Sequence, residues 1–270
     1  MFSNNKGTAL VTGASSGIGA IYADRLARRG YNLVLIARNR QRLDALAAHI
    51  TDQTGRAVEV VAADLGEKAE LGRVETVLRT DASVTLLVNN AGIGASVPTW
   101  QADVDLMERM IDINVTALTR LAYAAVPGFL GRGAGTIVNI ASVVALAPEF
   151  LLNGVYAASK AYVIALTASL NAELGDKGVR VQAVLPGATK TDFWDRSGVP
   201  LSVVPAEITM RADDMVDAAL AGLDLGETVT VPALLDVADW VAYEAARAAL
   251  VPNLSNAVPA GRYRPAAVAA

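Results

Sequence analysis

The sequence predicts an α/β fold, a doubly wound parallel sheet of about seven strands. Short, mostly apolar runs, typical of buried strands, alternate with longer segments whose apolar residues recur at helical spacing. The 270 residues are 53% hydrophobic and 19% charged, enough apolar material for one large core. Because no low-complexity linker or internal repeat interrupts the alternation, we expect residues 1–270 to form a single domain.

The elements follow this alternation in order. Strands are expected at 8–11, 33–37, 58–62, 84–88, 136–140, 179–185 and 227–231. Helices are expected from the glycine-rich segment to Arg29 and over 39–50, 67–79, 103–130, 155–174, 213–223 and 237–250, the fourth of them broken in two. The segment 187–212 is rich in proline and turn residues and is expected to be a lid, and 233–270 is a C-terminal extension.

Composition excludes several classes of protein. The chain has no cysteine and one histidine, His49, so we expect no disulfide scaffold and no metal site. A net charge of −4, with both signs scattered, gives no basic field for nucleic acid. The first seven residues lack an apolar signal core, and no run of about 18 uncharged apolar residues predicts a membrane span. The expectation is a cytoplasmic protein.

A glycine-rich turn stands between the first strand and the first helix. It reads Thr12-Gly13-x-x-x-Gly17-Ile18-Gly19, and glycine lets a backbone turn sharply and approach phosphate oxygens. The helix N-terminus that follows offers free N–H groups and a positive dipole end. The turn therefore indicates a nucleotide-binding site, and the alternative is a plain glycine-rich connection.

Tyr156 and Lys160 are four residues apart on a predicted helix and so share a face. An ammonium group favours the phenolate and is expected to lower the pKa of the tyrosine from about 10. Such a pair can exchange a proton with a carbonyl or hydroxyl oxygen. The alternative is an ordinary pair on an amphipathic helix.

Further polar residues follow predicted strands at their carboxyl ends, where ligands bind in such sheets. Ser142 follows 136–140, and Asn89-Asn90-Ala91-Gly92 follows 84–88. Asn114 falls inside a predicted helix, where asparagine is unfavourable unless its side chain has a specific partner.

Taken together and in order, these motifs, with Pro186-Gly187, make residues 5–232 resemble the short-chain dehydrogenase/reductase family in its short form. The resemblance implies a Rossmann fold, a nicotinamide cofactor and carbonyl–alcohol chemistry. It implies that Tyr156 is the general acid/base, that Lys160 lowers its pKa and binds the nicotinamide ribose, and that Ser142 orients the substrate oxygen. Asn114 would hold a water in a proton relay toward Lys160.

The resemblance also places cofactor contacts. Asn90 would lie near the adenine-side ribose, Asp64 near the adenine ring, and Thr191 at the carboxamide. The candidate cofactor-binding residues are Gly13, Ser15, Ser16, Gly17, Ile18, Gly19, Arg38, Asp64, Leu65, Asn90, Ala91, Gly92, Tyr156, Lys160, Pro186, Gly187 and Thr191. One departure is the 14-residue separation of Ser142 and Tyr156, one more than in many members, which places an insertion in 145–154.

The end of the second strand bears on the choice of nicotinamide. NAD-binding proteins of this fold place an acidic residue there, whereas this chain has Ala37 followed by Arg38. An arginine is a charge-assisted partner for a 2′-phosphate, and Ser15 and Arg40 would assist. NADP(H) is therefore expected over NAD(H). The alternative is that these arginines form a solvated helix start.

The sequence thus predicts an NADP(H)-dependent oxidoreductase acting on a mostly apolar carbonyl or secondary alcohol. Apolar residues flank the expected reacting centre: Ile93, 143–146, 150–152, Phe193 and Trp194. The last two could equally pack the lid. The rival interpretations are a nucleotide-sugar epimerase or dehydratase relative and a non-catalytic NADP sensor. The resemblance also suggests a homodimer or homotetramer built on the helices at 103–130 and 155–174.

Overall fold

The computed structural model describes residues 6–150 and 154–263. Its contacts divide the chain into two compact units, Met1–Ala233 and Leu234–Ala270, and each is described by itself. The boundary falls beside residue 233, where the predicted C-terminal extension begins.

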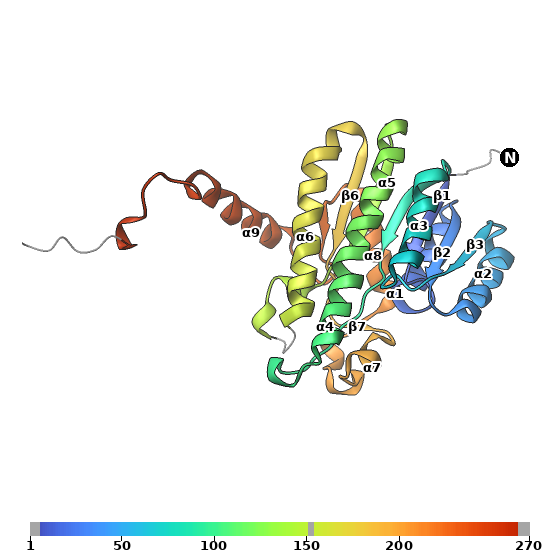
Figure 1. Cartoon of the computed structure of the whole chain (residues 1–270), viewed down its shortest axis with the longest axis horizontal. Coiled ribbons are helices and arrows are strands. Elements are labelled where there is room, and N and C mark those ends of the chain that lie inside the picture. The colour runs from blue at the N-terminus through green and yellow to red at the C-terminus, as the bar shows by residue number, and fades with distance from the viewer. Residues whose placement is uncertain (1–5, 151–153, 264–270) are drawn as a thin grey trace, which may run out of the picture. The chain divides into compact units, whose positions relative to one another are not determined.

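The first unit is built on a seven-stranded parallel sheet in the order β3-β2-β1-β4-β5-β6-β9 (Figure 1). Its strands are β1 Thr8–Thr12, β2 Asn32–Ala37, β3 Val58–Ala62, β4 Val84–Asn89, β5 Gly135–Ile140, β6 Val179–Val184 and β9 Val229–Thr230. The order reverses between β1 and β4, and in sheets of this kind a ligand binds in the crevice at this point, outside the carboxyl ends of the strands. The predicted doubly wound parallel sheet is confirmed.

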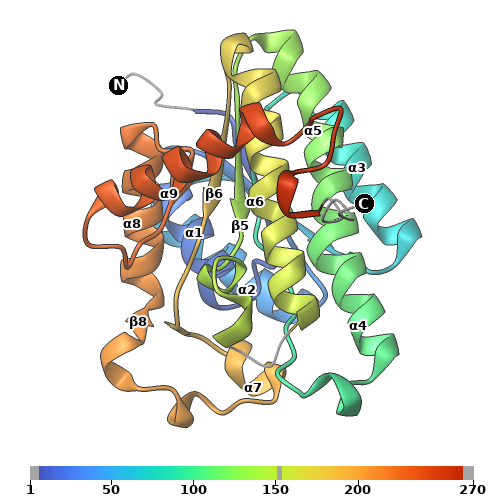
Figure 2. The ribbon, with the colours of Figure 1, turned by 90° about the vertical axis from the view of Figure 1, so that its left-hand side faces the viewer.

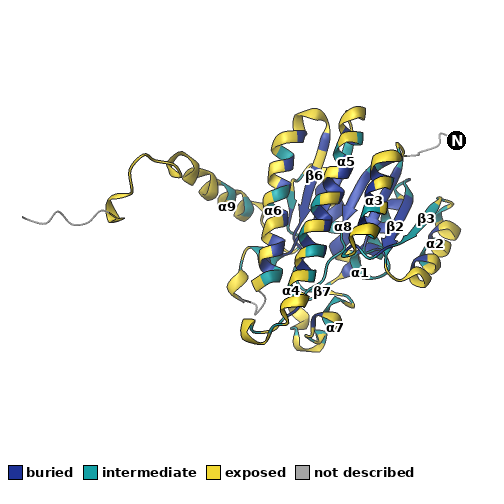
Figure 3. Ribbon diagram, in the orientation of Figure 1, coloured by how far each residue is buried: buried dark blue, intermediate teal, exposed yellow. Residues whose placement is uncertain are grey.

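Helices cover both faces of this sheet (Figure 2). One apolar core joins the sheet to α1 (Gly17–Arg28), α2 (Arg40–Thr54) and α8 (Ala212–Leu225). The other joins it to α3 (Lys68–Thr80), α5 (Leu118–Arg132) and α6 (Gly154–Leu174). Figure 3 shows the central strands buried between these layers, as expected for strands made largely of apolar residues.

The helix expected at 103–130 is present, with an unusual middle. It consists of α4 (Val104–Ile111), a π-helical turn (Asp112–Ala117) and α5. The expected break is therefore a wider turn within a continuous helical segment. Within the described part of the chain, Val104–Arg132 is the one helix long and apolar enough to cross a membrane, but half of its most apolar window is buried inside the protein, as in an ordinary core helix.

Most boundaries lie within two residues of expectation, and the clearest differences are in α2, β9 and the lid. α2 runs past residue 50 to Thr54, because Gly55, with a φ of 67°, supplies the left-handed conformation that ends it. The last strand, β9, keeps two residues of the expected 227–231. The lid is also not a plain loop: β7 (Thr189–Lys190) pairs in parallel with β8 (Met210–Arg211), and α7 (Phe193–Ser197) lies between them in sequence.

The second unit contains α9, Val237–Leu250, at the predicted bounds. The Asp236 carboxylate accepts a hydrogen bond from the Ala238 N–H and caps the first turn. Within the helix, the rings of Trp240 and Tyr243 pack at 5.2 Å between centroids.

Candidate active site

Four predicted residues converge where the sheet meets α6 and the π-helical turn. Ser142 follows β5, Tyr156 and Lys160 project from α6, and Asn114 belongs to the π-helical turn. Ser142, Lys160 and Asn114 are buried and Tyr156 is half-buried. The arrangement therefore collects a hydroxyl, a phenol, an ammonium and an amide at one edge of the sheet.

Lys160 is fixed by the strand beneath it. Its Nζ donates a hydrogen bond of 2.8 Å to the Ile140 carbonyl at the end of β5. The same Nζ lies 5.7 Å from the centroid of the Tyr156 ring, which places the cation against the aromatic system. The predicted sharing of one helix face by the two residues is confirmed.

The pKa of Tyr156 departs from the expectation. Burial raises it to about 12, and a hydrogen bond with the Ser142 hydroxyl only partly opposes this rise. Burial lowers the pKa of Lys160 to about 8. The expected lowering of the tyrosine pKa by Lys160 is thus contradicted, because loss of water around both groups outweighs an ammonium that lies beside the ring.

Ser142 is held by the backbone on both sides. Its Oγ donates to the Pro186 carbonyl and accepts from the Val144 N–H, both at 3.4 Å. Two segments after neighbouring strands are thereby joined, since Pro186 follows β6. The hydroxyl is positioned beside Tyr156 before any substrate arrives.

Asn114 binds the chain that follows β4. Its Oδ1 accepts from the Ile93 N–H, and its Nδ2 donates to the Ile93 carbonyl, both at 2.9 Å. Nδ2 also donates to Ser159 Oγ at 3.1 Å, and that hydroxyl donates to the Tyr156 carbonyl. The asparagine therefore fixes the loop after β4 to the helix that carries the tyrosine. Ser159 was missed in the sequence, because it belongs to no motif.

Thr12 is a second residue that the sequence analysis did not assign to the site. Its hydroxyl accepts from the N–H groups of Asn90 and Ala91, each at 3.0 Å, and donates to the Val88 carbonyl. The Asn90 Nδ2 donates to the Thr12 and Gly13 carbonyls. These bonds join the loops after β1 and β4 across the point where the strand order reverses.

The glycine-rich turn fits a dinucleotide. Gly13 has a φ of 66°, and a Cβ there would lie 2.7 Å from the Asn90 Nδ2, so any side chain would close the turn. The first turn of α1 contains no acidic residue, so its positive end faces the crevice without a carboxylate on the helix. Thr191, from the lid, packs against Gly17. A pyrophosphate would bind to the turn, and a nicotinamide ribose would lie toward Lys160.

The residues expected around the adenosine carry opposite charges. Arg38 lies 4.0 Å from the Asp64 carboxylate and is more than half exposed. Asp64 accepts a 2.6 Å hydrogen bond from Arg109 and a further one from the Gly66 N–H. Arg40, which was expected to assist Arg38, instead pairs with Asp44 one turn along α2. Arg38 is therefore the more weakly engaged of the two expected cations.

The two aromatic residues that open the lid behave differently. The ring of Phe193 packs on that of Tyr156, with 5.6 Å between centroids. The Phe193 ring also lies so close to Gly94 that a Cβ added to this glycine would be 2.5 Å from the ring edge. Trp194 instead donates its indole N–H to the Thr189 carbonyl at 2.7 Å. Phe193 thus forms a wall of the reacting centre, and Trp194 holds the lid together. Of the other predicted apolar residues, 151 and 152 lie outside the described residues.

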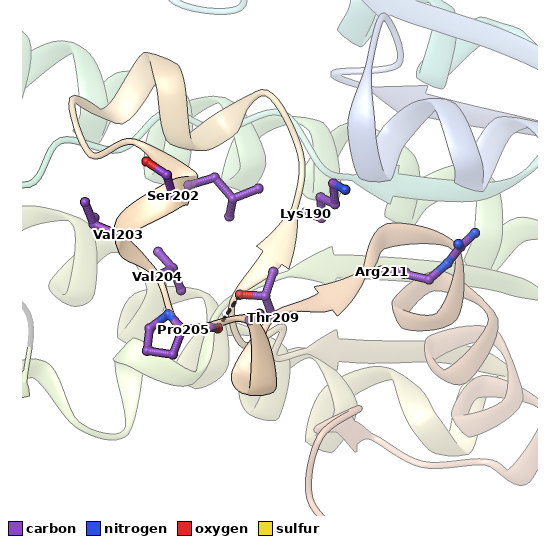
Figure 4. Close-up of a pocket in the computed structure, with 9 residues that line it drawn as sticks. Lys190, Ser202, Val203, Val204, Pro205, Thr209 and Arg211 are labelled. Carbon is purple, nitrogen blue, oxygen red and sulfur yellow. Dashed lines mark hydrogen bonds between the residues drawn. The ribbon is translucent and has the colours of Figure 1, made fainter.

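A separate hollow of about 610 Å³ opens on the outer part of the lid (Figure 4). Its lining is Lys190, Leu201, Ser202, Val203, Val204, Pro205, Ala206, Thr209 and Arg211. None of the four converging residues contributes to this lining, so the hollow is distinct from the reacting centre. Among the described residues, no group of three or more acidic, histidine or cysteine side chains could hold a metal ion.

A parallel sheet with a glycine-rich turn, a half-buried tyrosine, and a buried lysine and serine beside it defines a dinucleotide-dependent oxidoreductase. The family model for short chain dehydrogenase matches residues 7–199. The chain belongs to the short-chain dehydrogenase/reductase family, as the sequence motifs predicted.

Solved structures agree with this membership. A short-chain dehydrogenase from Sphingobium yanoikuyae, in complex with NADPH, is 49% identical with a TM-score of 0.92, over 95% of this chain and 100% of that one. A bulky-bulky ketone specific alcohol dehydrogenase from Comamonas testosteroni is 44% identical with a TM-score of 0.89, over 97% and 100%.

A curated relative is the very-long-chain 3-oxoacyl-CoA reductase of Anas platyrhynchos, 40% identical over 183 residues. The match covers 66% of this chain and 58% of that protein's length. The family and these relatives identify the chain as an oxidoreductase that acts on CH–OH groups.

Proposed function

We propose that the protein is an NADP(H)-dependent enzyme that interconverts ketones and secondary alcohols, with Tyr156 as the general acid/base. The observation that carries the proposal is the convergence of the Ser142 hydroxyl, the Tyr156 phenol and the Lys160 ammonium on one edge of the sheet. A bound nicotinamide supplies or accepts the hydride in this chemistry.

The proton is the part of the reaction that this chain's own residues perform. The Ser142 and Tyr156 hydroxyls are neighbours, so a carbonyl oxygen between them would accept one hydrogen bond from Tyr156 and a second from Ser142 once that hydroxyl exchanges its long bond to the Pro186 carbonyl for the substrate. Tyr156 then donates its proton to that oxygen as negative charge develops there. Its raised pKa keeps the phenol protonated at neutral pH, which is the form that ketone reduction requires.

Lys160 provides the local positive charge. With a pKa of about 8 it is mostly protonated at pH 7. Its position against the Tyr156 ring stabilises negative charge that forms on the phenol after the proton has left. Together with Asn114 and Ser159 it also fixes α6 at the reacting centre.

The preference for NADP(H) is supported by Arg38. Arg38 is exposed and stands where NAD-binding proteins carry an acidic residue. Its guanidinium lies 4.0 Å from the Asp64 carboxylate, which is a long ion pair. A 2′-phosphate would give its guanidinium a doubly charged partner. The NADPH held by the Sphingobium relative is consistent with this choice.

The apolar character of the substrate is supported by Phe193 and the residues after Ser142. Val144 is buried, Leu146 is exposed, and Phe193 covers Tyr156. The Comamonas relative, described as specific for ketones with two bulky sides, makes such ketones the first compounds to test. Cytoplasmic location and assembly into dimers or tetramers stay predictions from the sequence.

The test is NADPH oxidation, followed by absorbance, with a panel of ketones that range from small aliphatic to doubly bulky aryl compounds. Turnover with neutral, apolar ketones is expected, and assays without ketone give the background. Tight NADPH binding without turnover of any ketone or alcohol would support the sensor interpretation instead. Faster turnover of anionic ketones than of neutral ones would overturn the proposed substrate class.

A further inference from the structure

A side chain of the lid reaches the glycine-rich turn. Arg196, on α7, donates from Nη2 to the Ser16 Oγ at 2.9 Å. Ser16 precedes α1, yet its hydroxyl makes no hydrogen bond that caps this helix. The hydroxyl therefore serves a contact between the turn and the lid, which lie 180 positions apart in the sequence.

The same arginine belongs to a chain of charges. Its Nη2 lies 3.5 Å from the Asp192 carboxylate, and Asp192 lies 3.5 Å from Arg42 Nη1. Arg42 belongs to the first turn of α2, directly after β2. Ser16, Arg196, Asp192 and Arg42, which we call the latch, thus join the glycine-rich turn, the lid and α2 around the crevice described above.

The latch contains two positively charged side chains and one negatively charged one. Two guanidinium groups share one carboxylate, and Arg196 is held beside the positive end of α1. All three charged side chains are more than half exposed, and ion pairs between exposed groups are weak. An anion bound between Arg196 and the N-terminus of α1 would offset the repulsion between Arg196 and the positive helix end. It would also add a second negative charge for the two guanidinium groups.

We propose that Arg196 is a ligand for a phosphate of the dinucleotide, and that this contact, together with the one to Ser16, holds the lid over the bound cofactor. The inference rests on the proposed function for the identity of that anion. Asp192 lies 3.5 Å from the Arg196 guanidinium and would compete with the phosphate for it. The bound dinucleotide would thus add a second contact between the lid and the glycine-rich turn, through one exposed arginine.

The test compares dissociation constants for NADPH, measured by titration calorimetry on the full chain. Arg196→Gln is expected to weaken NADPH binding about 10- to 100-fold, the loss of a charge-assisted contact. Arg211→Gln is the matched control. Arg211 is also an exposed arginine of the lid, but it pairs with Asp213 and is not part of the latch. Arg196→Lys, which keeps the charge without the planar fork, should fall between.

Chymotrypsin cleavage after Phe193 and Trp194 supplies a readout independent of turnover. Saturating NADPH should protect these sites in the wild type and the Arg211→Gln variant, and protect them less in Arg196→Gln. Asp192→Asn removes the competing carboxylate, so it should bind NADPH as tightly as the wild type or more tightly. A purely structural brace predicts that it weakens binding as Arg196→Gln does.

The outcomes separate the two proposals. If the wild type does not bind NADPH, the proposed function fails. If the wild type binds NADPH and is protected, but Arg196→Gln matches Arg211→Gln, the role of Arg196 is overturned and the proposed function stands. Equal weakening by Asp192→Asn and Arg196→Gln would also overturn it.

Discussion

The two ends of the cofactor crevice are built in opposite ways. At the reacting end, Asn114, Ser142 and Lys160 are between 0% and 8% exposed, and protein groups satisfy their hydrogen bonds. At the end that would hold the phosphates and the adenosine, Arg196 and Arg38 are more than half exposed and lie 3.5–4.0 Å from carboxylates. One end is fixed before any ligand binds, and the other is completed by a ligand.

This difference separates chemistry from recognition. Burial raises the pKa of Tyr156 and lowers that of Lys160. The two arginines at the other end are instead more than half exposed to water. Substitutions at the buried end should therefore change rate and stability by large factors. Those at the exposed end should change affinity and selectivity by smaller ones.

The largest effect is expected at Tyr156. Tyr156→Phe removes only the hydroxyl and should lower kcat about 100- to 10,000-fold, the usual contribution of a positioned acid. The dissociation constant for NADPH should stay near that of the wild type, which is the control. A variant that keeps more than about a tenth of kcat would show that the proton comes from elsewhere.

Lys160→Met tests the cost of the buried ammonium. The pKa of Lys160 is lowered from 10.5 to about 8, so between these values the unfolded chain binds more protons and the wild type gains stability as pH rises. The penalty of about 3 kcal/mol is present below pH 8. The variant loses a hydrogen bond worth about 1 kcal/mol.

The variant should therefore be more stable than the wild type by about 2 kcal/mol at pH 7, with the difference vanishing near pH 10. Denaturant unfolding at both pH values measures this. The raised pKa of Tyr156 does not interfere, because its contribution is lost only above pH 10. A difference that is independent of pH would mean that Lys160 carries no buried-charge penalty.

At the exposed end, Arg38→Asp should reverse the choice of cofactor. It removes a phosphate partner and adds a repelling charge, so NADPH binding should weaken about 10- to 100-fold while NADH binding holds or improves. Arg40→Asp, two residues along, is the matched control because Arg40 already pairs with Asp44. Equal affinities of the wild type for NADPH and NADH would refute the assignment.

The smallest expected effect is the change in KM for each carbon added to the substrate. Each added methylene buried against Phe193 and its neighbours is worth about 0.8 kcal/mol, so KM should fall about fourfold per carbon along a ketone series. Steady-state kinetics with straight-chain ketones measures this. A flat series would mean that the apolar residues only pack the lid.

The sequence predicted the sheet because most of its strands are short runs made largely of apolar residues and each predicted helix is periodic on its own. It predicted the Tyr156–Lys160 face and the Ser142 position for the same reason, since spacing along one element determines them. The pKa of Tyr156 was predicted with the wrong sign, because desolvation depends on residues from several elements that no local pattern reveals.

The lid shows the same limit. The pairing of β7 with β8 joins two residues to two others about 20 positions away, too short a signal for periodicity. The separate roles of Phe193 and Trp194 depend on which side of α7 each faces. The contact of Arg196 with Ser16 belongs to no motif and becomes visible only when the chain is folded.

The π-helical turn has a consequence for how this gene can change its length. Such a turn holds one residue more than the α-helical turn it replaces, so deleting one residue within 112–117 would restore the tighter winding. Because the wider turn absorbs the additional residue, the helix on either side would keep nearly its present face, and the change would fall on the side chains within the turn itself. Asn114 lies inside this turn and is bound to Ile93, so a deletion that left the pairing of Arg120 with the buried Glu75 in place would still displace Asn114. Insertions and deletions, which surface loops tolerate, should therefore be selected against in the middle of this helix.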